Sequence, residues 1–175
     1  ACGPSGWIND LATSLGLKTL VCSTNEDAWK WSNVKRKTDR DDALKLARMA
    51  AMNELKAVHM PSEAHREFRS LVKYRKTLDQ RINKMKCTIR AWFVNHGIAI
   101  DTGEKAWSTV GRERINSFRK PMAECIPEEL WKAELDLELT QMDAVGEQLE
   151  LVVKKLEAIG KTDPRIQRIK TIPGV

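Results

Sequence analysis

Apolar residues recur at heptad spacing along two long stretches of the chain. In the first, residues 62–96, they alternate in steps of three and four around one polar position, Arg75: Phe68, Leu71, Leu78, Ile82, Met85, Ile89 and Trp92, with His96 next in register. The second covers residues 128–159: Leu135, Leu139, Met142, Val145, Leu149, Val152, Leu156 and Ile159. Such spacing aligns side chains along one helix face. The pattern predicts two long helices, ended by Gly97 and Gly160.

The two predicted helices carry opposite charge. Residues 62–96 hold nine Lys and Arg against three acids, whereas residues 128–159 hold three Lys against nine acids. Opposite charge favours pairing of one helix with the other over self-pairing. The sequence therefore predicts an antiparallel helical hairpin, or coiled-coil arm, with an irregular cap at residues 97–126 that includes a short helix over residues 104–119. Gly146 within the second helix is a candidate point of close approach for another helix.

The first 57 residues predict a smaller unit of mixed elements. Apolar positions indicate a helix over residues 5–15, a short strand over residues 17–22 and a second helix over residues 39–55. A lone strand leaves its backbone groups unpaired, so this segment is expected to be the closing part of an α/β layer. Trp29 and Trp31 can pack against that layer or stack on bases, and packing is favoured because the layer needs apolar cover.

Composition and charge limit the kinds of binding partner and of site that the chain is expected to have. The 175 residues are 31% charged and 42% hydrophobic with a net charge of +6, which suits one or two domains and a polyanionic partner. The cysteines (Cys2, Cys22, Cys87 and Cys125) form no C-x-x-C pair, so reduced thiols in a cytosolic protein are expected rather than a zinc site or disulfides. The longest uncharged run, residues 91–100, is too short to span a membrane.

Three carboxylates open the helix predicted at residue 39. Asp39, Asp41 and Asp42 lie within the string K-R-K-T-D-R-D-D-A-L-K-L-A of residues 35–47. Asp39 and Asp42 are three residues apart and share one helix face, while Asp41 faces elsewhere. Two carboxylates on one face can hold a divalent cation together. Acidic residues after a cap such as Thr38 also stabilise a helix start, and the spacing alone favours this capping interpretation.

Two groups of basic residues are candidate phosphate contacts. Four surround the aspartates: Lys35, Arg36, Lys37 and Arg40. Six lie along the first long helix and are called here the basic strip: Arg66, Arg69, Lys73, Lys76, Lys84 and Arg90. Lysine and arginine in such arrangements suit phosphate groups. The alternative for the basic strip is a solvated flank that the acidic helix partly neutralises.

The string K-T-D-x-x-D-A, running into L-x-L-A, resembles the last motif of the DEDD insertion-sequence transposases of the insertion-sequence-110 type, which are related to the Piv DNA invertase. The resemblance implies that Asp39 and Asp42 are the last two of four acidic residues that bind catalytic Mg²⁺ in a RuvC-like, RNase H-type domain. The opening A-C-G resembles the residues that follow the family's third acidic residue. I-P-G-V at residues 172–175 resembles a helix-hairpin-helix turn at the start of the family's C-terminal, serine-carrying domain.

The expected fold class is therefore mainly α, with the C-terminal part of an RNase H/RuvC-like α/β layer followed by the long antiparallel hairpin. The expected domains are a partial RuvC-like domain at 1–57, the arm at 58–160 and the start of a C-terminal transposase domain at 161–175. Without the first two acidic residues and the serine, the chain alone is expected to be inactive.

The resemblance also implies partners and a location. DNA, an element-encoded guide RNA, Mg²⁺ and further copies of the chain joined through the coiled-coil arm are expected, in the bacterial cytoplasm with the nucleoid and with no membrane partner. Two hypotheses of other kinds stay open. One is a helical interaction module, in which the heptad residues carry the function and the aspartates only cap a helix. The other is an RNA-binding arm that uses the basic helix without sequence preference.

Overall fold

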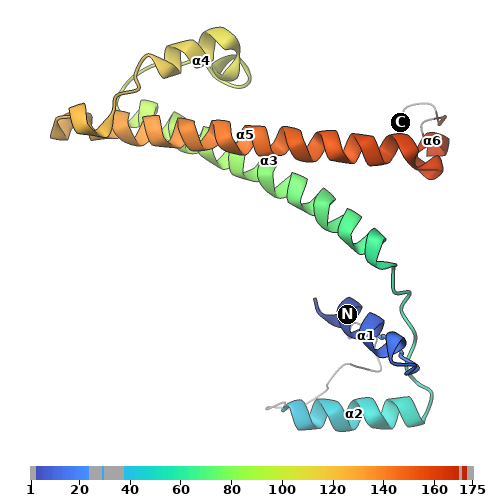
Figure 1. Cartoon of the computed structure of the whole chain (residues 1–175). Coiled ribbons are helices and arrows are strands. Elements are labelled where there is room, and N and C mark those ends of the chain that lie inside the picture. The colour runs from blue at the N-terminus through green and yellow to red at the C-terminus, as the bar shows by residue number, and fades with distance from the viewer. Residues whose placement is uncertain (1–2, 24–28, 30–37, 170, 173–175) are drawn as a thin grey trace. The chain divides into compact units, whose positions relative to one another are not determined.

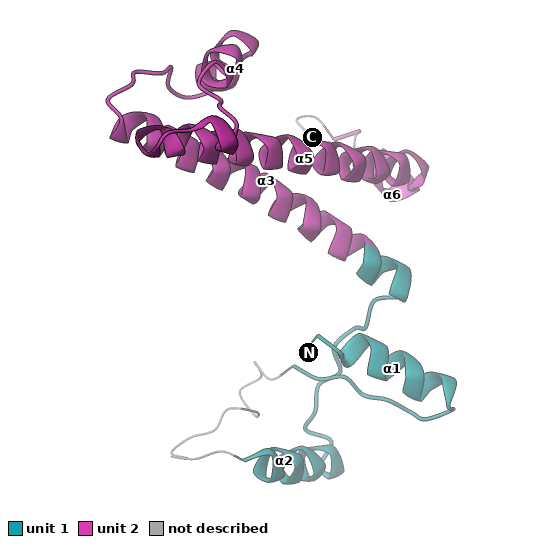
Figure 2. Ribbon diagram, turned by 60° about the vertical axis from the view of Figure 1, so that its left-hand side comes forward, with its two compact units in different colours: residues 1–67 teal, residues 68–175 magenta. Residues whose placement is uncertain are grey.

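The computed structural model describes residues 3–23, 29, 38–169 and 171–172, and it is mainly helical there (Figure 1). The expected mainly α class is confirmed at this level. The chain forms two compact units, unit 1 at residues 1–67 and unit 2 at residues 68–175 (Figure 2). The domain boundaries expected at residues 57 and 160 stay predictions.

Unit 1 contains two of the predicted helices. Helix α1 is Ser5–Ser14 and α2 is Asp39–Ala51. The second ends four residues before the predicted residue 55, because Asn53 takes a left-handed φ of 55°, which a helix cannot continue.

The strand predicted over residues 17–22 was wrong as a regular element. The segment makes a single antiparallel bridge, Cys22 to Ala57, beside which the Val58 N–H donates to the Val21 carbonyl at 2.7 Å. The chain after α2 thus supplies a neighbour for this segment. One bridge does not make a ladder, so the described residues contain no sheet.

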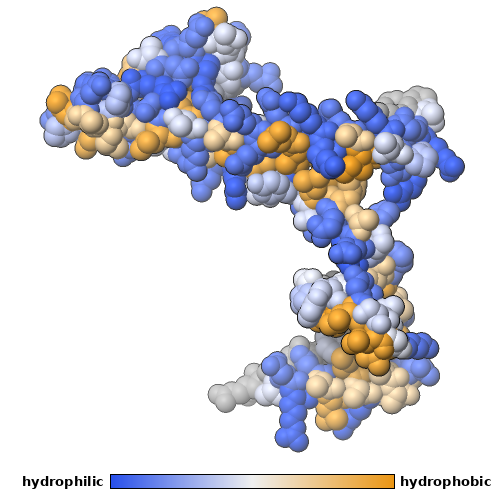
Figure 3. All heavy atoms as spheres, viewed as in Figure 1, coloured by the Kyte–Doolittle hydropathy of each residue, from blue (hydrophilic) through white to orange (hydrophobic). Residues whose placement is uncertain are grey.

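Unit 1 leaves much of its apolar surface exposed. Of the apolar face predicted for α2, Met49 is buried, whereas the side chain of Leu46 is 40% exposed. On α1, Trp7, Ile8 and Leu11 are exposed as well, and Figure 3 shows hydrophobic atoms gathered on the surface of this unit. Contiguous exposed apolar surface is typical of a face that contacts further protein.

Unit 2 is built on two long helices that run in opposite directions (Figure 1). They are α3, Glu63–Asn95, whose first turn belongs to unit 1, and α5, Leu130–Thr162. Between them lie the 3₁₀ turns η2 (Lys105–Trp107), η3 (Met122–Glu124) and η4 (Pro127–Glu129) and helix α4 (Thr109–Asn116), and α6 (Pro164–Ile169) follows.

The ends of the long helices test two glycine predictions. Gly97 has a φ of 67° and follows the end of α3 as predicted. Gly160 does not end α5, which continues to Thr162. The stop comes from Pro164 instead, because its ring disfavours helical backbone at Asp163, where ψ is 113°.

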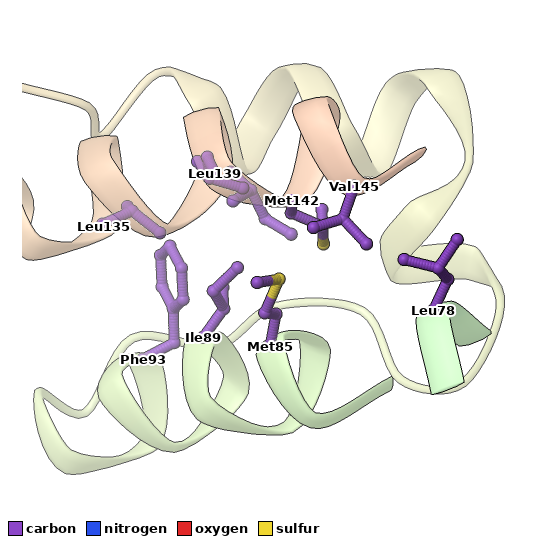
Figure 4. Packing of buried hydrophobic residues seen from close by; sticks show 9 residues of the cluster. Leu78, Met85, Ile89, Phe93, Leu135, Leu139, Met142 and Val145 are labelled. Carbon is purple, nitrogen blue, oxygen red and sulfur yellow. The ribbon is translucent and has the colours of Figure 1, made fainter. Parts of the chain in front are cut away.

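The core of unit 2 lies between the C-terminal half of α3 and the N-terminal half of α5, with one residue from α4. Figure 4 shows side chains of the two long helices pointing toward one another. The buried cluster is Leu78, Met85, Ile89, Phe93, Ile115, Leu135, Leu139, Met142 and Val145. Most of these are predicted heptad residues, so that pattern located the packed faces. The heptad residues Phe68 and Leu71 near the start of α3 and Leu156 and Ile159 near the end of α5 are outside the cluster.

Candidate metal centre and nucleic-acid interface

The start of α2 is a capping box. The Thr38 hydroxyl accepts the backbone N–H of Asp41 at 3.3 Å, and the Asp41 carboxylate accepts the backbone N–H of Thr38 at 3.2 Å and its hydroxyl at 2.6 Å. Both residues thereby satisfy backbone N–H groups that the first turn would otherwise leave unpaired. The capping interpretation is confirmed for Asp41, which therefore has a structural role of its own.

The other two aspartates lie outside this capping box. Asp39 is exposed and Asp42 half-buried, three residues apart in the first turn of α2. Their carboxylate oxygens suit Mg²⁺, which usually binds one or two carboxylates together with waters and substrate phosphates. In the part of the chain that the structure describes, no group of three or more His, Cys, Asp or Glu side chains is arranged to hold a metal. Asp39 and Asp42 thus fit part of a magnesium site, and their role stays a prediction.

The basic residues near the aspartates are only partly described. Lys35, Arg36 and Lys37 lie outside the described residues, as does Trp31, and Arg40 is exposed in the first turn of α2. Trp29 contacts α2: its carbonyl accepts from the Lys45 ammonium at 3.0 Å, and that ammonium lies 5.9 Å from the ring centroid. These contacts support the packing interpretation of Trp29.

The basic strip divides into two kinds of side chain. Arg66 forms an ion pair with Asp10 of α1, which lowers the pKa of that carboxyl, and donates to the Pro61 carbonyl at 2.6 Å. Arg90 donates to the Gly103 carbonyl at 2.6 Å. The other four are exposed and take part in no ion pair with any described residue: Arg69, Lys73, Lys76 and Lys84.

Two acids of α5, Asp136 and Asp143, pair with the segment between the long helices rather than with α3. Arg112 of α4 donates to both carboxylate oxygens of Asp143 at 2.7 and 2.8 Å, and Arg119 donates to Asp136 at 2.6 Å. Within the described ranges no ion pair joins α3 to α5. The alternative interpretation, in which the acidic helix partly neutralises the basic strip, is therefore not observed as ion pairing among the described residues, and arginines of the cap bind two of the acids instead.

A further charge cluster fixes the start of α5. Glu129 accepts hydrogen bonds from Lys120 and, at 2.6 Å, from Lys132. The hydrogen bond from Lys120, and after it the one from Lys132, lower the pKa of the Glu129 carboxyl to about 2. The hydrogen bond to Glu129 in turn raises the pKa of Lys120. Three basic residues of the cap, Arg112, Arg119 and Lys120, thus bind the acids of α5 and its first turn.

The charge contacts of the cap had a signal in the sequence that we missed. Arg112 and Arg119 are seven residues apart, and so are Asp136 and Asp143. The earlier arginine pairs with the later aspartate, Asp143, and the later arginine pairs with the earlier one, Asp136. That is the register of two antiparallel segments. The net charge of each long helix, taken alone, does not show that Asp136 and Asp143 form their ion pairs with the cap.

Comparison with known proteins supports the resemblance found in the sequence. The family model of the IS110-type DEDD transposases, described as "Transposase", matches residues 15–96. This segment is therefore similar to the IS110-type transposases. This range contains Asp39, Asp42 and the whole basic strip, and it confirms the resemblance carried by the K-T-D-x-x-D-A motif.

A curated relative extends the match. The protein named "Putative transposase y4qE" from Sinorhizobium fredii (strain NBRC 101917 / NGR234) is 32% identical to this chain over 107 residues. The aligned part is 61% of this chain and 27% of that protein, so the chain spans about a quarter of the relative. No solved structure matches the chain. None of the helices in the described ranges is both long and apolar enough to cross a bilayer.

Proposed function

We propose that this transposase segment supplies two ligands of a catalytic magnesium site from α2 and a nucleic-acid contact surface from α3. The observation that carries the first part is that the family match includes the K-T-D-x-x-D-A motif, in which the capping box engages Asp41 and not Asp39 or Asp42. Asp39 and Asp42 would then hold the ion, and Arg40 beside them would contact phosphate.

Bound Mg²⁺ would activate a nucleophile and stabilise charge at the scissile phosphate during DNA cleavage and rejoining. The role of α2 is to hold two carboxylates one turn apart on a helix whose start is fixed by the capping box. Such a fixed start holds the backbone that carries both carboxylates. The proposal requires further oxygen ligands, which the described residues do not supply.

Unit 1 has the surface expected of part of a RuvC-like layer. Its helices expose apolar side chains, and a hollow of about 270 Å³ is lined mainly by apolar residues, Leu20, Leu46, Ala50 and Leu55, with Asn53. The segment before α2 already makes one antiparallel bridge, from Cys22 to Ala57. We propose that further strands of an α/β layer cover this surface in the transposase.

Unit 2 supports contact with nucleic acid. Since the cap arginines bind Asp136 and Asp143 of α5, the exposed lysines and arginine of the basic strip have no ion-pair partner among the residues that the structure describes. Exposed cations of this kind bind phosphate by releasing counterions. DNA and an element-encoded guide RNA are the proposed partners, with location at the bacterial nucleoid as a consequence.

The arm also keeps a second apolar stripe. Leu130, Leu137 and Leu151 of α5 are exposed at spacings of seven and fourteen residues. Heptad spacing of exposed leucines is typical of a helix that pairs with another helix. This supports the proposed homo-oligomer through a coiled-coil arm, and it is also the observation that favours the alternative of a helical interaction module.

Salt-dependent binding separates these functions. We expect the affinity for a duplex DNA oligomer to fall steeply with salt, and the Lys73→Gln/Lys84→Gln double variant to lower the log–log slope by about 0.9 for each phosphate contact removed. Lys154→Gln/Lys155→Gln on α5 is the matched control, since both lysines are exposed but lie on the acidic helix. Equal slopes for the two double variants would contradict a role of the basic strip, and binding that does not depend on salt would favour the interaction module.

A further inference from the structure

A recessed hollow of about 590 Å³ lies in unit 2 between α3 and the segment that leads into η2. It is called here the α3–η2 pocket. Its lining includes Asn83, Lys86 and Arg90 of α3 and Gly103, Glu104 and Trp107 of the following segment. Its residues follow the acidic motif of residues 37–43 in the sequence and are not part of it. Neither the family match nor the metal proposal gives this pocket a role.

Two N–H donors at this pocket are buried without an acceptor. They are Nε of Arg90 and Nε1 of Trp107, and neither has a hydrogen-bond partner among the described residues. Buried donors are paired in nearly all folded proteins, so two orphaned donors lining one hollow indicate that an acceptor from outside the chain belongs there.

The neighbouring groups hold these donors in place. The terminal nitrogen of Arg90 donates to the Gly103 carbonyl at 2.6 Å, which fixes the guanidinium plane. The ammonium of Lys86 lies 5.3 Å from the ring centroid of Trp107. Cation–π contact of this kind orients the indole and places a second positive charge at the pocket. Two cations thus face a single acid, Glu104, so the pocket is net positive.

We propose that the α3–η2 pocket holds one backbone phosphate of the bound nucleic acid, with Arg90 and Trp107 donating to its oxygens and Lys86 neutralising its charge. A phosphate offers several acceptor oxygens on one centre, which matches two unpaired donors from residues that line one pocket, and a guanidinium is well suited to bind it. Since Arg90 lies on the same helix as Lys84, one strand could contact both the exposed strip and the pocket. The choice of a nucleic-acid phosphate rests on the proposed nucleic-acid binding.

The indole N–H of Trp107 reports directly on occupancy. In the full chain labelled with ¹⁵N, its signal is assigned by its loss in Trp107→Phe, and oligo-dT is then added at low salt. We expect a downfield, saturable shift of this signal. If oligo-dT binds by fluorescence anisotropy while the Trp107 signal stays in place, the pocket proposal is overturned and binding by the basic strip stands. If oligo-dT does not bind at all, both proposals fail.

Inorganic phosphate distinguishes the source of the ligand. A shift with oligo-dT that inorganic phosphate reproduces only weakly supports a backbone phosphate. A shift with inorganic phosphate and none with bound oligo-dT overturns the nucleic-acid assignment, because the pocket would then take a free anion.

Two substitutions of opposite sign give a second test. Lys86→Gln should weaken oligo-dT binding about tenfold, because a charge-assisted contact is lost. Glu104→Gln should strengthen it several-fold, because a carboxylate is removed from beside the phosphate. Unchanged affinity in both variants, with circular dichroism showing retained helix content, would overturn the proposal.

Cysteine alkylation provides a readout that needs no substitution. Cys87 lines the pocket and its side chain is exposed, whereas Cys125 lies elsewhere in unit 2. Saturating oligo-dT should slow alkylation of Cys87 by a small maleimide, measured by peptide mass spectrometry, and leave Cys125 unchanged. Equal rates at Cys87 with and without bound oligo-dT would count against occupancy of the pocket.

Discussion

Truncation of Phe93 should remove a large part of the stability of unit 2. The Phe93 side chain is fully buried and makes edge-on contacts with Phe118, at 5.2 Å between ring centroids, and with Trp131, at 5.7 Å. It therefore joins α3 to the segment after α4 and to the first turn of α5. His96 extends this group by stacking on Trp131 at 4.4 Å.

The magnitude follows from burial. Replacing a buried phenylalanine by alanine costs about 3–5 kcal/mol, through lost transfer free energy and the cavity left behind. Because small domains are stable by only about 5–15 kcal/mol, Phe93→Ala should remove about a fifth or more of the free energy of unfolding. Phe93→Leu keeps most of the volume but loses two aromatic pairs of about 0.5–1.5 kcal/mol each, so it should cost about 1–3 kcal/mol.

Urea unfolding followed by circular dichroism measures the effect. Val94→Ala is the matched control, since Val94 is the next residue of α3 and is 74% exposed, and it should change the unfolding free energy by less than about 0.5 kcal/mol. If Phe93→Ala and Val94→Ala shift the midpoint equally, Phe93 is not part of a packed core and the arrangement of α3, α5 and the cap would be wrong.

Four further predictions concern the capping box, the charge cluster, the cap and helix α5. Asp41→Ala should cost about 1 kcal/mol by leaving Thr38 without its partner, seen as faster hydrogen exchange in α2 but not α5. Because the pKa of Glu129 falls from 4.5 to about 2 on folding, its stabilising contribution should be complete above pH 4.5 and be lost as the pH falls toward 2, and urea unfolding of Glu129→Gln should lack this dependence. Gly111→Ala should destabilise unit 2 by about 1–3 kcal/mol, since the new Cβ would lie 2.3 Å from a backbone oxygen. Gly146→Ala, with open space around its Cβ, should instead stabilise α5 by up to about 1 kcal/mol in the same unfolding measurement.

The sequence predicted the helices well because their signals are local. Periodic apolar residues placed α1, α3 and α5 within a few residues of their observed bounds. Where an end depends on one backbone conformation, as at Asn53 or before Pro164, the prediction was off by a few residues. Gly146, a candidate for close approach of a second helix, has no atom of a described residue within 4 Å of an added Cβ.

Contacts between segments were harder to predict. Phe93 lies one position off the heptad pattern, and it is buried only because Phe118 and Trp131 of the cap and of α5 surround it. The pairing of Arg112 and Arg119 with acids of α5 likewise depends on how the cap folds back. Such contacts join residues far apart in the sequence, where periodicity carries no information.

The sequence predicted which side chains could bind a metal, but it did not predict the hydrogen bonds around them. The motif located Asp39 and Asp42, and the family match includes them. We had expected Asp41 to differ from them only in the face it occupies, whereas it holds the Thr38 capping box. Asp41→Ala is therefore a poor control for metal binding, and Asp41→Asn, which keeps an acceptor for the Thr38 N–H, is the better one.

Paramagnetic broadening by Mn²⁺, used in place of Mg²⁺, tests the proposed metal site most directly. In ¹⁵N spectra of the full chain, the account predicts that sub-stoichiometric Mn²⁺ broadens the amide signals at the first turn of α2 before any others. The effect should be lost in Asp39→Asn and in Asp42→Asn and be retained in Asp41→Asn. Broadening centred elsewhere, or equal in all three variants, would contradict the assignment of Asp39 and Asp42 as ligands.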